Sequence, residues 1–184
     1  MTRFLKGAAV LVVAALLAAC DNNTPLMDRV VESDAKGVAA ELAKGGDIDA
    51  RNNYGWTALT HAARSGDAAM AKLLIENGAN VNAVDDTSWS PLMRAAMKGH
   101  TEVVKLLLAH GAEVHHADNA GWTALHWSAQ QGNGEIMRLL IDSGADLKAE
   151  TKDGWTPRMV AQNEGHTDLV NLISRWMNDA GAVK

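Results

Sequence analysis

The chain has 184 residues, a formal net charge of −5 and a single cysteine. That length is sufficient for one ordinary domain. Lys and Arg gather nowhere in the sequence, and because a nucleic-acid-binding surface needs a basic patch, nucleic acid is excluded as a partner. A lone cysteine also excludes any disulfide within the chain.

The first 20 residues have the pattern of a bacterial lipoprotein signal. Arg3 and Lys6 precede an apolar run, residues 7–19, that is shorter than the roughly 20 residues needed by a membrane-spanning helix. The run ends in Leu-Ala-Ala-Cys, with the cysteine at position 20, and this motif resembles the lipobox. In lipobox proteins the signal is cut directly before the cysteine, which then carries acyl chains.

These features predict a lipid-anchored protein. We expect residues 1–19 to be a signal peptide, Cys20 to be the lipid attachment site and residues 20–23 to be a short acylated linker. The anchored chain would lie on the periplasmic side of a bacterial membrane. Asp21 favours the inner membrane, because it resembles the retention signal of enterobacterial lipoproteins. An ordinary cleaved signal with an incidental cysteine is the alternative.

From residue 55 onward the sequence repeats at an interval of 33 residues. Gly-Trp-Thr-Ala-Leu at 55–59 recurs as Ser-Trp-Ser-Pro-Leu at 88–92, as Gly-Trp-Thr-Ala-Leu at 121–125 and as Gly-Trp-Thr-Pro-Arg at 154–158. A fixed period of about 20 to 50 residues is typical of stacked units that bury their apolar faces only against one another. Position 1 denotes the first residue of each recurrence.

Each unit is predicted to form two helices and a turn. The Thr or Ser at position 3 is a helix N-cap, followed by Ala or Pro, and the Gly at position 12 ends this first helix. A second apolar run, such as Met70–Ile75, forms the second helix. We expect positions 5, 8 and 9 of the first helix to pack in the core, together with Leu73, Leu106 and Leu139 of the second helices.

The recurring residues resemble the ankyrin repeat, whose Thr-Pro-Leu-His-x-Ala motif takes the forms TALTHA, SPLMRA, TALHWS and TPRMVA. The resemblance implies an all-α ankyrin-repeat solenoid, with β-hairpin-like fingers between helix pairs, and a monomer that binds other proteins. Residues 24–54 would be an N-terminal capping repeat, 55–87, 88–120 and 121–153 full repeats, and 154–184 a C-terminal capping repeat and tail. A tetratricopeptide array, with a period of about 34 residues and a different aromatic pattern, fits less well.

Partner-binding residues are predicted from helical spacing. Positions 7, 10 and 11 share one face of the first helix, and unlike the core positions they differ from repeat to repeat. This variable face includes Val160, which is position 7 of the last repeat. A varied face is where a partner can be specified. With nearby finger residues, the predicted partner-binding set is His61, Arg64, Arg94, Met97, Lys98, Trp127, Gln130, Gln131, Trp89, Trp122, Tyr54 and Asp86.

The Trp at position 2 of each repeat is either a binding anchor or a cover for the neighbouring turn. Repetition favours the structural role, above all for the outermost copies, and we expect these rings to lie too far apart to stack directly. Trp127 is unique at its position and is predicted to be a binding hot spot that adds little stability. Trp122 is predicted to contribute about 1 kcal/mol or more to stability.

The sequence does not support a metal-dependent or catalytic function. His110, His115 and His116 form the one local histidine cluster, but the last two are neighbours that point apart in an extended turn, and zinc needs convergent ligands. His126 and Ser128 diverge on a helix, and an acylated cysteine leaves no thiol nucleophile. We therefore expect no metal, no cofactor, no catalytic residue and no enzymatic activity.

Two functions remain open at this point. One is a membrane-anchored periplasmic protein that docks a protein partner on its concave face and finger tips, as an accessory or protective factor for an envelope enzyme. The alternative is an immunity-type inhibitor of a toxin that acts in the periplasm. Both functions would use the same surface, so they predict the same partner-binding residues and differ only in the partner.

Overall fold

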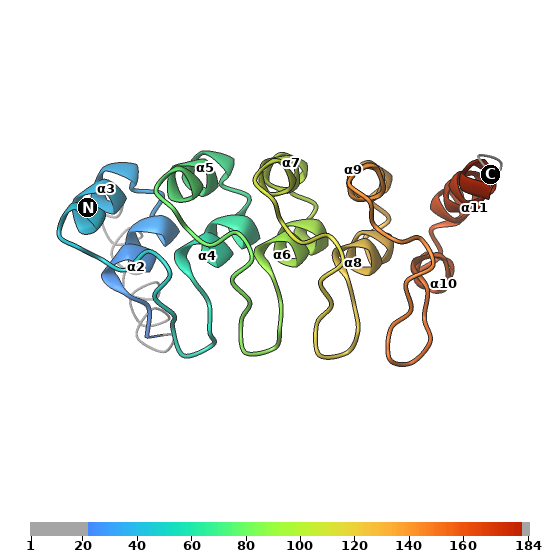
Figure 1. Ribbon diagram of the computed structural model, residues 1–184, viewed down its shortest axis with the longest axis horizontal. Helices are drawn as coiled ribbons and strands as arrows, with labels where there is room; N and C mark the ends of the chain where they lie inside the picture. Colours follow the sequence, from blue (N-terminus) through green and yellow to red (C-terminus); the bar gives the residue numbers. More distant parts are fainter. Residues whose placement is uncertain (1–21, 182–184) are drawn as a thin grey trace, which may run out of the picture.

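The computed structural model describes residues 22–181, so the predicted signal peptide, Cys20 and Asp21 lie outside the described residues. Figure 1 shows helix pairs stacked side by side in one row. In the described region no helix has the length and apolar character needed to cross a membrane. The helices are α2 (Pro25–Val31), α3 (Ala35–Ala43), α4 (Ala58–Ser65), α5 (Ala68–Glu76), α6 (Pro91–Lys98), α7 (Thr101–Ala109), α8 (Ala124–Gln130), α9 (Gly134–Asp142), α10 (Pro157–Asn163) and α11 (Thr167–Gly181).

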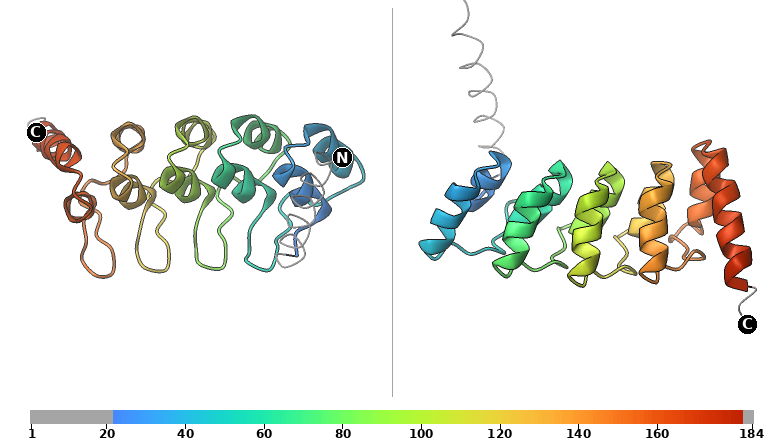
Figure 2. Two further views of the ribbon diagram at one scale, coloured as in Figure 1. Left: turned by 180° about the vertical axis from the view of Figure 1, so that it is seen from behind. Right: turned by 90° about the horizontal axis from the view of Figure 1, so that it is seen from above.

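Long loops, which we call fingers, connect consecutive helix pairs and project on the side of the first helices α4, α6, α8 and α10 (Figures 1 and 2). Backbone hydrogen bonds close each finger, such as that from Asp118 N to Trp122 O at 2.9 Å. Within residues 22–181 the β structure amounts to an isolated bridge between Ala117 and Thr123. The all-α solenoid with hairpin-like fingers is therefore confirmed.

The predicted starts of the first helices are confirmed, and the predicted glycine ends are confirmed for α4 and α6. Helices α8 and α10 end one residue earlier than predicted, with Gln131 and Glu164 as their C-caps. The side chain of Thr57 caps α4 and accepts a hydrogen bond from Thr60 N at 3.3 Å, and Ser90 caps α6 in the same way. Gly66 and Gly99 end these helices with φ angles of 78° and 76°. This left-handed conformation favours glycine, because a Cβ atom would clash with the backbone.

The core stripe of the first helices is confirmed in the repeats that begin at residues 55, 88 and 121, where positions 5, 8 and 9 are buried. The second-helix prediction is wrong by one residue, since Leu73 and its counterparts Leu106 and Leu139 are only partly buried. The fully buried residue is the next leucine in each case, namely Leu74, Leu107 and Leu140. Each step along a helix turns the side chain by about 100°, so one residue decides which leucine points inward.

The last helix pair carries polar groups where earlier pairs are apolar. Arg158 stands at position 5 and is exposed, whereas its counterparts Leu59, Leu92 and Leu125 are buried. Its Nε donates a hydrogen bond to Ser174 Oγ of α11 at 3.1 Å. The two polar residues that replace apolar ones in the last repeat are thus hydrogen-bonded to each other on a solvated surface.

Gly121 lies where one finger packs closely on the next. Its φ is 84°, and an added Cβ would lie 2.7 Å from Lys152 N. Gly154 has the same place in the last repeat, with a φ of 77° but no atom within 4 Å of such a Cβ. We expect Gly121→Ala to lower the free energy of unfolding by about 2–3 kcal/mol and Gly154→Ala by about 1 kcal/mol. Urea unfolding measures both, and equal losses would show that the finger contact has no effect.

Candidate functional site

A buried polar side chain organises each finger, four residues before the position-2 Trp. Asp85 Oδ1 accepts hydrogen bonds from Thr87 N at 2.8 Å and from Trp89 N at 3.0 Å. Because these bonds hold the tryptophan backbone against the turn, they fix the position of the Cα atom from which each indole ring extends. Sequence reasoning missed this set, although its small polar residues recur at the repeat interval: Asn52, Asp85, Asp118 and Thr151.

In two repeats the position-7 side chain, Arg94 or Trp127, joins the position-2 rings of neighbouring repeats. The guanidinium carbon of Arg94 lies 4.6 Å from the ring centroid of Trp56 and 4.3 Å from that of Trp89. The ring centroid of Trp127 lies 4.3 Å from that of Trp89 and 4.5 Å from that of Trp122. We call these five residues the Trp–Arg ladder. Cation–π and aromatic contacts contribute about 0.5–2 kcal/mol each, so the ladder links three repeats.

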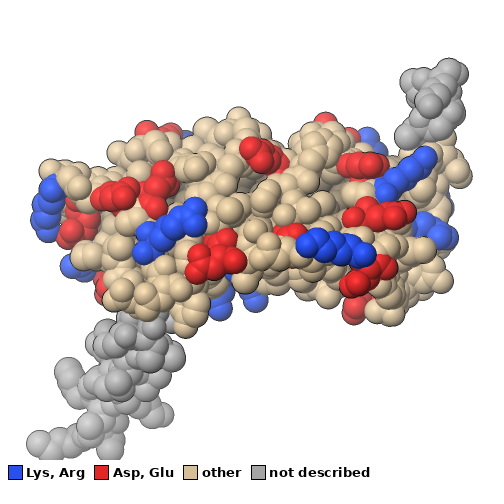
Figure 3. Space-filling view, turned by 60° about the horizontal axis from the view of Figure 1, so that its bottom comes forward, with Lys and Arg blue, Asp and Glu red and all other residues tan. Residues whose placement is uncertain are grey.

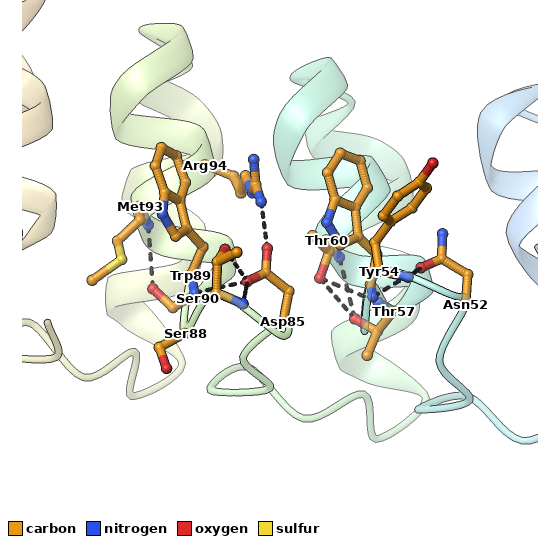
Figure 4. A network of polar contacts seen from close by, with 12 residues as sticks. Asn52, Tyr54, Thr57, Thr60, Asp85, Ser88, Trp89, Ser90, Met93 and Arg94 are labelled. Atoms are coloured by element: carbon orange, nitrogen blue, oxygen red, sulfur yellow. Dashed lines mark hydrogen bonds and ion pairs between the residues drawn. The ribbon is translucent and has the colours of Figure 1, made fainter. Parts of the chain in front are cut away.

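Arg94 also forms an ion pair with Asp85 (Figure 4). The Asp85 side chain is only 1% exposed. Burial raises the pKa of Asp85, but hydrogen bonds from Thr87 and Arg94 and from the backbone of Trp89 and Thr87 outweigh it, so the pKa lies below its ordinary value. Asp85 therefore stays ionised at neutral pH and orients Arg94, whereas the predicted site residue Asp86 is exposed and outside this pair.

The ladder changes what was expected of Trp127. Position-2 rings of adjacent repeats were predicted to be too widely spaced to stack, and Trp127 fills the space between two of them. It does not stand on a surface separate from Trp122, because the two rings are in contact. Its Nε1 is buried, with no hydrogen-bond partner in the described part of the chain. Trp127 is therefore a packing residue as well as a candidate binding residue.

The outermost Trp155 also departs from expectation. It was predicted to be more structural than the middle copies, yet it is 40% exposed and borders an open hollow of about 760 Å³ with Met159. Val160, which was placed on the variable face, is buried in the core. Val160 is too short to fill the place that Trp127 fills one repeat earlier, so Trp155 lacks a comparable neighbour.

Two clefts of about 430 Å³ each lie beside the ladder and share Arg64. The first lies between two fingers, with Tyr54 and Trp56 among its lining residues, and the second lies against α4 and α6. Met97, Gln130 and Gln131 line neither cleft. The predicted site residues that the two clefts bring together are Tyr54, His61, Arg64, Asp86, Arg94 and Lys98.

Family models for ankyrin repeats match residues 5–85 and 92–181, and a further ankyrin-repeat model matches residues 69–108. The chain belongs to the ankyrin-repeat family. A comparison with curated proteins finds no match. Ankyrin repeats are protein-interaction modules, so the clefts on the finger side of this ankyrin-repeat protein are the first place to look for a protein partner. Acidic and basic residues are interspersed on that side (Figure 3).

Two histidines, each at position 13 of its repeat, tie adjacent ankyrin repeats together. His100 Nε2 lies 3.1 Å from Arg64 O, and His166 Nε2 lies 2.9 Å from Gln130 O. Each imidazole thus reaches back to a carbonyl near the end of the preceding first helix, where intrahelical partners run out. These contacts fix the backbone beneath Arg64 and Gln130 and leave their side chains exposed or half-exposed.

The histidine cluster considered for metal binding makes backbone contacts. His110 Nδ1 lies 2.8 Å from Leu106 O, and His116 Nε2 lies 2.8 Å from Ser88 O of the neighbouring finger. Among the residues that the structure describes, no three His, Cys, Asp or Glu side chains converge as metal ligands would. The absence of a metal or cofactor from the functional protein stays a prediction.

His126 is fully buried and links the last two repeats through Trp155 O, which lies 3.0 Å from its Nε2. Its Nδ1 lies 2.9 Å from Thr123 Oγ1 of its own repeat. Desolvation lowers the pKa of His126, against the opposing effects of backbone contacts at Trp155 and Ala149 and of the Asp118 charge. Unfolded histidine takes up a proton near about pH 6.5, and the folded protein does so only at lower pH. As the pH falls, the unfolded state therefore binds this proton before the folded state does, and protonation stabilises the unfolded state relative to the folded one.

We accordingly expect the free energy of unfolding to fall as the pH decreases below about 6.5. His126→Gln, which cannot take up this proton, should show a shallower decline between about pH 7.5 and 5.5. His115→Gln is the matched control, because His115 is exposed and should keep the decline of the parent protein. Urea titrations at a series of pH values measure the slope, and an unchanged slope in His126→Gln would contradict this account.

Proposed function

We propose that this ankyrin-repeat protein binds a protein partner on the surface formed by its fingers and first helices. The observation that carries the proposal is the pair of clefts that share Arg64. Tyr54 is 51% exposed in the first cleft, and Arg64 and Lys98 are exposed in the second. Exposed aromatic and cationic side chains on a frame held rigid by the Trp–Arg ladder are typical of binding hot spots.

The partner is proposed to be an envelope protein that this chain assists or protects, without catalysis of its own. Ankyrin repeats are typically non-enzymatic scaffolds, which supports binding rather than chemistry. The clefts are lined largely by exposed side chains, whereas enzyme pockets enclose most of a small ligand's surface. An extended partner segment suits such open clefts better than a small substrate does.

Site-specific photo-cross-linking tests the binding proposal. A photoreactive residue in place of Tyr54 should capture one major protein from solubilised envelope. The same residue in place of Lys72, which is exposed on the second helix α5, is the control and should capture that protein poorly. Equal capture from both positions, or none from Tyr54, would remove the finger side as the binding surface.

We further propose that the protein is anchored on the periplasmic side of a bacterial membrane through Cys20, with the inner membrane favoured by Asp21. The support is the lipobox resemblance alone. Metabolic labelling with a fatty-acid analogue should mark the parent protein, and Cys20→Ser should carry no label and accumulate as precursor, because no thiol remains to be acylated. Label retained by Cys20→Ser would contradict the anchor.

A further inference from the structure

The second cleft is basic in an otherwise acidic chain. Its lining residues are Val31, His61, Arg64, Ser65 and Lys98, with no Asp or Glu among them. Of the ion pairs within residues 22–181, none involves Arg64 or Lys98. We call this cleft the basic notch. In a chain with a net charge of −5, this cleft therefore brings together two cations that have no ion pair within the described residues and no acidic residue beside them in the lining.

Arg64 is held in place before any partner arrives. Its guanidinium carbon lies 5.1 Å from the ring centroid of Trp56, and its backbone oxygen contacts His100 Nε2 at 3.1 Å. A planar guanidinium in a fixed position can bind both oxygens of a carboxylate at once. Lys98, one helix pair further on, adds a compact charge that can rotate toward the same carboxylate or an adjacent one.

The first cleft begins where the basic notch ends, because Arg64 lines both. Tyr54 is half-exposed there, and its ring centroid lies 6.3 Å from that of Trp56. The far wall carries the exposed acid Asp86 and the paired Asp85 and Arg94. Acidic groups of a ligand are therefore repelled from the far wall and attracted to the basic notch, while the aromatic floor suits an apolar group.

We propose that the basic notch binds the carboxylate side chains of an acidic segment in the protein partner, and that an aromatic residue of this segment lies against Tyr54 in the first cleft. This inference rests on the proposed function, since it assigns the chemistry of the partner's segment. Charge complementarity selects the segment, and the aromatic contact fixes its register along the two clefts.

A labelled peptide with the sequence Gly-Asp-Trp-Glu-Asp-Gly serves as the probe, and its uncharged counterpart Gly-Asn-Trp-Gln-Asn-Gly is the reference. Fluorescence polarisation with the full-length chain in detergent should show at least about tenfold tighter binding of the acidic peptide at low salt, decreasing as salt screens the charges. Equal binding of the two peptides, or no binding of the acidic one, would overturn the inference.

Charge reversal tests whether the basic notch is the site. Arg64→Glu with Lys98→Glu should weaken binding of the acidic peptide by about tenfold or more. Lys36→Glu with Lys148→Glu changes the net charge equally at exposed positions outside both clefts and should leave the affinity unchanged. Equal losses in the two double variants would place the effect in the overall charge and overturn the inference. Arg64→Gln is a milder change that should also weaken binding of the acidic peptide. Thermal melting of this variant checks that the loss of binding does not come from unfolding.

Two results separate this inference from the proposed function. If the Tyr54 cross-linker still captures its partner from the Arg64→Glu, Lys98→Glu variant at full yield, the protein-binding function stands and the acidic-segment inference fails. Displacement of the peptide by an equal concentration of glycerol phosphate would show that the notch recognises any small anion, such as a lipid headgroup, and would also overturn the inference. Failure of the Tyr54 cross-linker in the parent protein removes the proposed function itself.

Discussion

Replacing Trp127 by Ala is expected to lower the free energy of unfolding by about 2–3 kcal/mol. The ring stands between Trp89 and Trp122, at centroid distances of 4.3 and 4.5 Å, so its removal opens a gap in the middle of the Trp–Arg ladder. Trp127→Phe should lose much less, because it keeps ring contacts and removes an N–H that has no partner within residues 22–181. Urea unfolding followed by circular dichroism measures both variants.

Trp155→Ala is the matched control for this experiment. Trp155 occupies the recurring position 2 but is 40% exposed, and in the described chain its ring is in contact with no other aromatic ring. We expect its loss to lower stability by about 1 kcal/mol or less. If Trp127→Ala were as stable as the parent, the ladder would contribute nothing and the original prediction of a pure binding residue would hold.

Features that depend on neighbours in sequence were predictable. An N-cap such as Thr57 acts on an amide three residues away, and a glycine such as Gly66 ends a helix through its own φ angle. The fixed interval of 33 residues then extends the N-cap prediction to every repeat, whereas the glycine end shifts by one residue in α8 and α10. The error at Leu73 and Leu74 shows the limit, since a shift of one residue changes which side chain is buried while the apolar pattern stays the same.

Features that depend on the distance between repeats were not predictable. The sequence shows that Trp127 is unique at its position, but it does not indicate that its ring contacts Trp89 of the preceding repeat. Residues 85 and 86 are both aspartates, yet Asp85 is buried against Arg94 and Asp86 is exposed. The repeat interval separates the two positions only in the last repeat, where Thr151 aligns with Asp85 and Lys152 aligns with Asp86.

Removal of the Asp85 carboxylate is expected to have the largest effect of any single change at the site. Asp85→Ala leaves the guanidinium of Arg94 unpaired between two indole rings and frees the amides of Thr87 and Trp89. Breaking a buried ion pair by removing one partner typically lowers stability by about 3–5 kcal/mol, and we expect a loss near about 3 kcal/mol. Asp86→Ala, one residue away and exposed, should change stability by less than about 0.5 kcal/mol.

A double-mutant cycle and a pH series separate the ion pair from the finger turn. Arg94→Met keeps an apolar chain between Trp56 and Trp89, so Asp85→Ala should be less harmful in that background if the pair matters. Because the pKa of Asp85 is lowered by folding, its contribution is present above about pH 4 and lost as the pH falls through the lowered pKa. Asp85→Asn should therefore show a shallower loss of stability in acid than the parent protein. If Asp85→Asn and the parent protein lost stability equally in acid, and the double-mutant cycle showed no coupling to Arg94, Asp85 would act only as the hydrogen-bond acceptor of its finger.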